Sequence, residues 1–328
     1  MPKDPPFDIT PEILSYVADI SELVGKIGST NNMSATPTLR RENRIRTIHG
    51  SLAIEQNTLS IEQVTAVING KHIIAPPKDI AEVKNAYEIY DRMEELDPYS
   101  VDDLLLAHGV MMRGLIDEAG VFRSGPVGVA DRDGHILHFG TLPDYVPGLV
   151  CDLLGWARES RLHMLIKSCV LHYELELIHP FADGNGRTGR LWHTLMLSKW
   201  NSIFAWLPVE SIVNDRQKDY YDAINASNIG CSSTKFITFM LSSINSSLIE
   251  ASEMIDEMID EPCRPAETRW RAVKAYLEGN TDIRNAELCG ILKVSPATAN
   301  RLLRSWCEDG KLERYRDGRT WAYRLSVK

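Results

Sequence analysis

The segment HPFADGNGRTGR, residues 179–190, combines residue types that together suit phosphate chemistry. Successive glycines let backbone N–H groups converge on an anion, and a helix that follows them adds the positive end of its dipole. Asp183 offers a hard oxygen to Mg²⁺, while Arg187 and Arg190, three residues apart, share one helix face and can bind further phosphate oxygens. His179 is the group of this segment that can accept a proton near neutral pH. The segment therefore indicates a nucleotide polyphosphate, Mg²⁺ and a base that deprotonates an incoming hydroxyl.

The simpler alternative for this segment is a tight turn followed by solvated arginines. Two features favour the phosphate site over that alternative. The loop lies between two apolar helical patterns, and its charged side chains are denser than a turn requires.

The neighbouring residues predict two helices that hold this loop. Apolar residues recur at helical spacing over 161–178, and a second helix is expected at about 187–200, which leaves ADGNG as the connection. Ser60 and Gln63 form a capping box at the start of another helix. The other helices expected before residue 250 cover residues 11–27, 39–57, 61–69, 81–96, 101–115 and 144–158.

A β-hairpin is predicted within this helical region, at residues 120–140. Val127 and Val129 precede an Asp-Arg-Asp-Gly turn, and Ile136 and His138 follow it. Alternating residues on both sides of such a turn are typical of a hairpin.

The C-terminal part of the chain reads as a separate module. The acidic, proline-interrupted stretch at 251–265 predicts the end of a helix and a linker. Three short helices and a hairpin then predict a winged helix-turn-helix at 266–328, with SPATANRLLRSW as its recognition helix and Trp306 and Trp321 in its core. Residues 265–328 contain 13 Lys and Arg against 8 Asp and Glu, a balance of +5 in a chain whose net charge is −9. This basic segment makes DNA a candidate partner, and protein contact is the alternative.

The composition is that of an ordinary globular protein, with 44% hydrophobic and 25% charged residues among 328. No apolar run approaches the roughly 20 residues that cross a bilayer, and the N-terminus lacks the pattern of a secretory signal. The six cysteines are scattered without metal-binding spacing, which favours core thiols in a reducing cytoplasm. A cytoplasmic protein without membrane partners is expected.

The motif at 179–190 matches every defined position of H-x-F-x-[DE]-G-N-G-R-x-x-R, the signature of the Fic family, and the chain resembles that family over about residues 40–245. The resemblance implies an all-α fold: a Fic helical bundle with a β-hairpin flap, plus the small C-terminal winged-helix domain. The expected organisation is an N-terminal helical region at 1–100, a Fic core at 101–250, the linker at 251–265 and the winged helix at 266–328.

Fic proteins mostly transfer AMP from ATP to a Ser, Thr or Tyr hydroxyl of a target protein. By resemblance, His179 is the general base, Phe181 packs in the core, Asp183 holds Mg²⁺, and the flap clamps the target by strand addition. The residues expected to contact ATP are Gly184, Asn185, Gly186, Arg187, Thr188, Gly189 and Arg190 in the motif, Tyr220 and Asn228 near the adenosine, and Val127, Gly128, Val129 and Ala130 in the flap.

A second motif, SLAIEQN at 51–57, resembles the Fic inhibitory helix, [ST]-x-x-x-E-[GN], within a helix at about 40–57. It departs from the pattern at Gln56, with Asn57 one residue later. By this resemblance, Glu55 forms a bidentate ion pair with Arg190 and occupies the guanidinium intended for the γ-phosphate. ATP then binds with its phosphates misaligned for attack, and a positioning error of about 1 Å costs about a hundredfold in rate. The sequence thus predicts an autoinhibited adenylyltransferase.

Three alternatives stay open from the sequence. Glu55 could instead position a water that removes AMP from the target. The nucleotide donor could be another nucleotide, such as UTP. The chain could also be a DNA-binding regulator whose Fic domain senses a nucleotide, although a sensor would not need His179. Similar proteins often dimerise, so a homodimer is a further candidate.

Overall fold

The computed structural model describes residues 4–29, 37–130, 136–260, 265–317 and 320–326. The chain divides into two compact units, Met1–Glu253 and Met254–Lys328. The Asp-Arg-Asp-Gly turn of the expected hairpin and residues 261–264 of the expected linker lie outside the described residues. Among the described residues, no helix is long and apolar enough to span a membrane.

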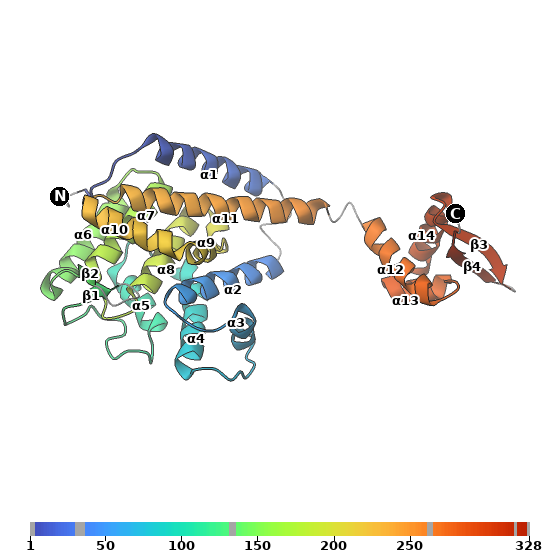
Figure 1. The fold of residues 1–328 in the computed structure, drawn as a ribbon, viewed down its shortest axis with the longest axis horizontal. Coiled ribbons are helices and arrows are strands. Elements are labelled where there is room, and N and C mark those ends of the chain that lie inside the picture. Colours follow the sequence, from blue (N-terminus) through green and yellow to red (C-terminus); the bar gives the residue numbers. More distant parts are fainter. Residues whose placement is uncertain (1–3, 30–36, 131–135, 261–264, 318–319, 327–328) are drawn as a thin grey trace. The chain divides into compact units, whose positions relative to one another are not determined.

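The first unit is built from helices that surround a buried central pair (Figure 1). The two central helices are α7 (Met164–Ile178) and α8 (Asn185–Trp200), and most of their side chains are buried. Their apolar residues extend around the whole helix rather than along one stripe, as expected for helices inside a domain. The others are α1 (Pro11–Ser29), α2 (Pro37–Ile54), α3 (Ile61–Ile68), α4 (Pro77–Asp91), α5 (Val101–Met111), α6 (Val146–Glu159), α9 (Val209–Asp215), α10 (Gln217–Gly230) and α11 (Thr234–Asp260), with short 3₁₀ turns at Met93–Glu95, Pro143–Tyr145 and Ser202–Ala205.

The helix α2 ends earlier than its sequence pattern predicts, at Ile54 rather than at Asn57. The Gln56 N–H donates to the Ala53 carbonyl at 3.0 Å, and the Asn57 N–H donates to the Leu52 carbonyl at 3.1 Å. Gln56 has a φ of 66°. These bonds and this left-handed residue form a Schellman motif, which closes a helix by satisfying its last carbonyls. Glu55 is therefore the C-cap residue of α2.

The capping box predicted at the start of α3 is confirmed. The Ser60 side chain accepts from the Gln63 N–H, and the Gln63 side chain accepts from the Ser60 N–H.

The expected hairpin is present as the antiparallel strands β1 (Gly128–Ala130) and β2 (Ile136–Phe139). Gly128 pairs with Phe139 and Val129 with His138, and an irregularity follows between Val129 and Ala130. The predicted fold class, a mostly helical protein with a β-hairpin, is confirmed.

The end of the first unit differs from the expected linker at 251–265, because α11 continues to Asp260. No glycine or proline stands between Thr234 and Glu261, so nothing in the sequence ends this helix before Pro262. Figure 1 shows α1 beside α11, and Lys26 donates to Ser252 at 3.2 Å there.

The second unit contains α12 (Pro265–Gly279), α13 (Asn285–Leu292), α14 (Pro296–Glu308) and the antiparallel strands β3 (Leu312–Asp317) and β4 (Thr320–Leu325). Trp306 lies in the core of this unit with Leu288 and Leu303. Trp321, which the sequence placed in the core, is instead 45% exposed, and the guanidinium of Arg314 lies over its ring at 4.0 Å. The arginines on the opposing strand contact part of this ring, and these cation–π contacts take the place of packing in the core.

Candidate active site

The loop between α7 and α8 turns through two left-handed residues. His179 closes α7 with a φ of 53°, and Gly184 precedes α8 with a φ of 82°. A side chain at Gly184 would collide with Met112, so this position requires glycine for both backbone and space. The Asn185 amide accepts from the Phe181 N–H at 2.8 Å and donates to its carbonyl at 2.9 Å. The Asn185 side chain therefore holds the loop closed. Because both ends of its amide are used in this way, Asn185 can contact a phosphate through its backbone N–H.

The imidazole of His179 is oriented by the helix that precedes it. Its Nδ1 lies 3.3 Å from the Glu176 carbonyl oxygen. A carbonyl can only accept, so Nδ1 carries the proton and the lone pair of the neutral ring is on Nε2. This tautomer is the one that a general base needs for proton uptake at Nε2.

A buried arginine that sequence reasoning missed, Arg123, connects the hairpin to this histidine. Its Nε donates to the His179 carbonyl at 2.7 Å, and its Nη1 donates to the Gly125 carbonyl at 2.8 Å. Its Nη2 donates to the Thr141 carbonyl, at the other end of the hairpin. A cation beside the last carbonyls of α7 also complements that helix dipole. The only early signal was its place in GVFRSG, at the start of the segment 120–140 in which the hairpin was predicted.

A second residue missed by the sequence, His108 on α5, supports the loop from below. Its ring stacks on Phe181 with centroids 3.7 Å apart, its Nε2 lies 3.0 Å from the Asp183 carbonyl, and its Nδ1 accepts from the Gly120 N–H at 3.0 Å. Burial lowers the pKa of His108 to about 4, so the ring is neutral and Nε2 donates. Phe181 is buried, as expected for a residue that packs in the core.

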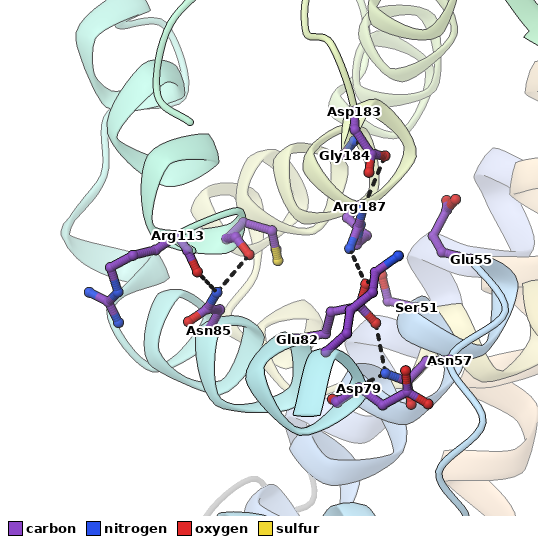
Figure 2. A network of polar contacts seen from close by, with 12 residues as sticks. Ser51, Glu55, Asn57, Asp79, Glu82, Asn85, Arg113, Asp183, Gly184 and Arg187 are labelled. Atoms are coloured by element: carbon purple, nitrogen blue, oxygen red, sulfur yellow. Dashed lines mark hydrogen bonds and ion pairs between the residues drawn. The ribbon is translucent and has the colours of Figure 1, made fainter. Parts of the chain in front are cut away.

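Asp183 and Arg187 belong to a chain of polar contacts that reaches the end of α2 (Figure 2). Asp183 Oδ1 accepts from the Gly184 N–H at 2.6 Å and from Arg187 Nη2 at 3.1 Å. Arg187 Nη1 donates to Glu82 Oε1 at 2.9 Å, and Glu82 Oε2 accepts from the Asn57 amide at 2.8 Å. Arg187 is thus engaged by two acids, and Glu82 on α4 is a partner that no local pattern indicated.

Arg190 is held by the end of α2. Its Nε donates to Ser51 Oγ at 3.1 Å, and its Nη2 donates both to the Ser51 carbonyl at 3.0 Å and to Glu55 Oε1 at 2.8 Å. Burial lowers the pKa of Arg190, but Glu55, Tyr220 and Glu176 together raise it by more, so this pKa is raised. The expected bidentate geometry is wrong, because Ser51 occupies the Nε side and Glu55 receives a single hydrogen bond. A side chain at Gly186 would collide with the Glu55 carboxylate, so glycine also makes room for this pair.

The two arginines that the sequence grouped together therefore have separate partners. Arg187 faces Glu82 and Asp183, whereas Arg190 faces Ser51 and Glu55. They do not share one acidic partner in the described structure.

A largely buried acid, Glu176, whose side chain is 13% exposed, lies close to this second group. Burial raises the pKa of Glu176 to about 7, while the charge of Arg190 lowers it and that of Glu55 raises it. Its Oε1 is 3.8 Å from His172 Nε2, and the same nitrogen lies 3.3 Å from the Tyr220 hydroxyl. Tyr220 is 1% exposed, so the structure places it in the core beneath the arginine.

The remaining candidate residues lie around this centre. Asn228 accepts from the Tyr173 hydroxyl at 2.8 Å, and Thr188 is buried. A side chain at Gly189 would meet Glu176 and His172, so this glycine permits the close packing of α7 and α8. Val127, Gly128, Val129 and Ala130 form the first half of the hairpin, and the Val127 carbonyl accepts from the Gly140 N–H at 3.0 Å.

The Asp183 carboxylate fits a role in holding Mg²⁺. Its side chain is 51% exposed, and its hydrogen bonds with Gly184 and Arg187 both use Oδ1. Within the described residues, no group of three or more His, Cys, Asp or Glu could hold a metal ion. One carboxylate with phosphates and waters is the ligand set that Mg²⁺ accepts in nucleotide sites.

Comparison with known proteins agrees with this geometry. The model of the Fic/DOC family matches residues 95–197. The crystal structure of a Fic family protein from Desulfovibrio desulfuricans G20 is 42% identical, covers 99% of this chain and 99% of that chain, and superposes with a TM-score of 0.81. The chain belongs to the Fic family. The resemblance seen in the motif is confirmed.

Curated relatives of this Fic protein are named protein adenylyltransferases. That of Caenorhabditis elegans is 29% identical over 226 residues, which cover 64% of this chain and 42% of the relative. That of Culex quinquefasciatus is 30% identical over 203 residues, which cover 58% of this chain and 38% of the relative. The chain thus spans about two fifths of the length of these relatives. The structure of C. elegans Fic-1 (aa134–508), 22% identical with a TM-score of 0.61 over 75% of this chain and 72% of that one, shares the fold.

Proposed function

We propose that this Fic protein transfers AMP from ATP to a Ser, Thr or Tyr hydroxyl of a target protein, and that Glu55 restrains the reaction. The observation that carries the proposal is the contact between Glu55 and Arg190 beside a loop that carries an oriented His179. The names of the curated relatives support the reaction.

In the proposed reaction, His179 Nε2 removes the proton of the target hydroxyl as its oxygen attacks the α-phosphorus. The new bond joins that oxygen to the α-phosphorus, the bond to the bridging oxygen of the β-phosphate breaks, and pyrophosphate leaves. The Nδ1–H bond to the Glu176 carbonyl keeps the lone pair of the neutral ring on Nε2, the accepting nitrogen. The hairpin is the proposed docking edge for the target, and Arg123 fixes the base of that edge to His179.

The phosphates are proposed to bind where α8 begins. Backbone N–H groups of Gly184, Asn185 and Gly186 and the helix dipole favour an anion there. Mg²⁺, held by Asp183, would neutralise phosphate charge when bound. Arg190 would reach the terminal phosphate once Glu55 leaves it. Arg187 keeps Asp183 in place through its Nη2, so its contribution is positional as well as electrostatic.

Glu55 restrains this reaction by competition for one guanidinium. Arg190 is buried, and its charge-assisted bond to Glu55 is short, at 2.8 Å. While that bond persists, the γ-phosphate lacks its partner and the α-phosphorus is not aligned for attack. A misalignment of about 1 Å lowers the rate about a hundredfold.

Auto-AMPylation with α-³²P-labelled ATP tests the proposal. Glu55→Gly is expected to increase label incorporation about a hundredfold over the wild type. His179→Ala in the Glu55→Gly background is expected to abolish the label. Glu88→Gln is the matched control, because it removes an ion pair with Arg113 that is largely exposed and does not involve the motif.

Incorporation that does not rise in Glu55→Gly would refute the restraint. Label that survives His179→Ala would refute the base. Parallel reactions with labelled UTP identify the donor, and release of AMP from a labelled target by wild-type protein, lost in Glu55→Gly, would favour the hydrolytic reaction instead.

DNA binding by the second unit is a second candidate function, and the surface of its wing favours it. Arg301 and Arg304 are exposed on α14, and the guanidiniums of Arg314 and Arg316 lie 4.0 and 5.6 Å from the centre of the exposed Trp321 ring. Arginines and an exposed aromatic ring suit contact with phosphates and sugars. Such binding weakens steeply with salt, because phosphate contacts release counterions.

Fluorescence anisotropy of a labelled duplex across salt concentrations tests this candidate. Arg301→Ala with Arg304→Ala is expected to weaken binding and to reduce the salt slope by about 2. Arg324→Ala is the matched control, since Arg324 pairs with Glu313 on the same wing. An absence of binding at low salt would leave this unit as a protein-contact module.

A further inference from the structure

A pocket apart from the motif lies against the N-terminal half of α2. Its volume is about 500 Å³, within the range of small-molecule sites. The residues that line it include Arg40, Arg41, Arg44, Asp91, Glu94 and Trp206. Three arginines against two acids make the lining net positive.

Two hydrogen-bond donors at this pocket are buried without an acceptor among the described residues. They are Arg44 Nη1 and the indole Nε1–H of Trp206. A buried donor without a partner costs about 1–3 kcal/mol, so proteins retain such groups where they have another use. Burial also lowers the pKa of Arg44, and the nearby charges of Asp91, Glu210 and Glu94 offset this only in part. Both donors offer N–H groups and no acceptor, so their complement is an anion.

We propose that this pocket binds a small phosphate monoester that carries hydroxyl groups. Guanidinium groups match phosphate oxygens in geometry and charge. Asp91 and Glu94 are exposed acceptors at the same pocket and would receive the hydroxyls of the ester. The Trp206 and Arg44 donors are shielded from solvent, so the phosphate reaches them when the exposed side chains of Arg40 and Arg41 move around it.

The pocket is connected to the motif through α2. Arg44, Ser51 and Glu55 are spaced by seven and four residues, which places them on one helix face. The Arg44 guanidinium lies 5.7 Å from the centre of the Tyr90 ring, and the Tyr90 hydroxyl shares a hydrogen bond with Ser51, which binds Arg190. A ligand that repositions Arg44 can therefore act through Tyr90 and Ser51 on the last turn of α2, which presents Glu55.

NMR of the tryptophan indole N–H groups tests the binding directly. The chain has seven tryptophans, and Trp206→Phe identifies the signal of Trp206. Titration of the full chain with ribose 5-phosphate is expected to shift that signal until it saturates. Inorganic phosphate is expected to shift it too, but with a higher half-saturation concentration. Arg44→Met is expected to raise the half-saturation concentration at least about tenfold, whereas Arg158→Met, a surface arginine paired with Asp97, leaves it unchanged.

The signals of the other tryptophans report whether each variant is folded. A Trp206 signal that does not move, that moves linearly without saturation, or that moves equally in Arg44→Met would overturn the proposal. A response to ribose without phosphate would overturn it as well, because the phosphate would then not be recognised.

The effect on catalysis rests on the proposed function, whereas the binding does not. If Glu55 restrains transfer, ribose 5-phosphate is expected to lower label incorporation by the wild type further and to leave Glu55→Gly unaffected. If ribose 5-phosphate binds in the NMR titration but label incorporation by the wild type is the same with and without it, the binding site is supported and its link to Glu55 is refuted. Absence of label in all variants would instead count against the transfer reaction itself.

Discussion

Arg187 and Arg190 lie one turn apart on α8 and each is paired with an acid from the N-terminal helices, yet the two acids are held differently. Glu82, the partner of Arg187, is inside helix α4, its side chain is 5% exposed, and Asn57 binds its second oxygen. Glu55, the partner of Arg190, is the C-cap of α2 and its side chain is 30% exposed. The first pair is built into the fold, and the second is the pair that a phosphate would replace in the proposed reaction.

The largest expected effect on the free energy of unfolding comes from removing each of these two acids in turn. Glu82→Ala leaves the buried Arg187 with Asp183 as its remaining acid, and the free energy of unfolding is expected to fall by about 3 kcal/mol. Glu55→Ala is expected to cost less than about 1 kcal/mol, because the carboxylate is partly exposed and Ser51 still binds Arg190. Urea denaturation measures both.

Glu88→Ala serves as the exposed reference in the same measurement and is expected to cost less than about 1 kcal/mol. Equal losses for Glu82→Ala and Glu55→Ala would contradict the distinction between a permanent and a replaceable pair.

The pH dependence of stability distinguishes the two pairs, because the charges of Glu55 and Arg190 affect the pKa of Glu176 and those of Glu82 and Arg187 do not. The pKa of Glu176 is raised from 4.5 to about 7 by burial, so the folded protein holds this proton more tightly than the unfolded chain. Its contribution to stability is complete below pH 4.5 and is lost as the pH rises through 7. Between pH 5 and 8 this loss is of the order of 2 kcal/mol.

Glu176→Gln is expected to remove that share of the pH dependence in denaturation series. The charge of Glu55 raises the pKa of Glu176, so Glu55→Gln is expected to move the transition to lower pH. Burial also raises the pKa of Glu174, to about 7, with no contribution from Glu55, and Glu174→Gln is the matched control. If the pH of this transition is the same in Glu55→Gln as in the wild type, Glu176 does not interact with the Glu55–Arg190 pair.

The smallest expected effect concerns the turn that holds Glu55. Gln56 has a φ of 66°, a conformation that costs a side-chain-bearing residue about 1 kcal/mol and costs glycine little. Gln56→Gly is expected to raise the free energy of unfolding by about 1 kcal/mol and to lower basal label incorporation. Gln56→Ala is expected to bring no gain, and an equal gain for both would show that the backbone conformation is not the cause.

The local features of this chain were readable from its sequence. Helical spacing of apolar residues located the helices, Ser60 and Gln63 identified a capping box, and the alternation around 127–138 identified the hairpin. The motif at 179–190 and the acid at Glu55 also came from local patterns, and the structure brings Glu55 to Arg190.

The parts of the site and fold that the sequence did not predict depend on contacts between residues far apart in the chain. Arg123 and His108 matter through backbone carbonyls and N–H groups that become neighbours only after folding. Glu82 had the pattern of an ordinary helical acid, and no spacing rule joins it to Arg187, which is 105 residues away. Trp321 was assigned to a core by residue type, although an aromatic ring can instead be covered by arginines on a neighbouring strand.

The Schellman end of α2 sets the time scale on which the site can change state. A C-cap residue is released when the last turn of its helix unwinds, without displacement of the helix itself, and such fraying takes well under a microsecond. The bond from Asn57 to Glu82 opposes this unwinding two residues beyond the acid. In the proposed reaction, release of Glu55 from Arg190 therefore requires the opening of a single turn and one amide contact, so it is a fast local equilibrium on which nucleotide binding can act.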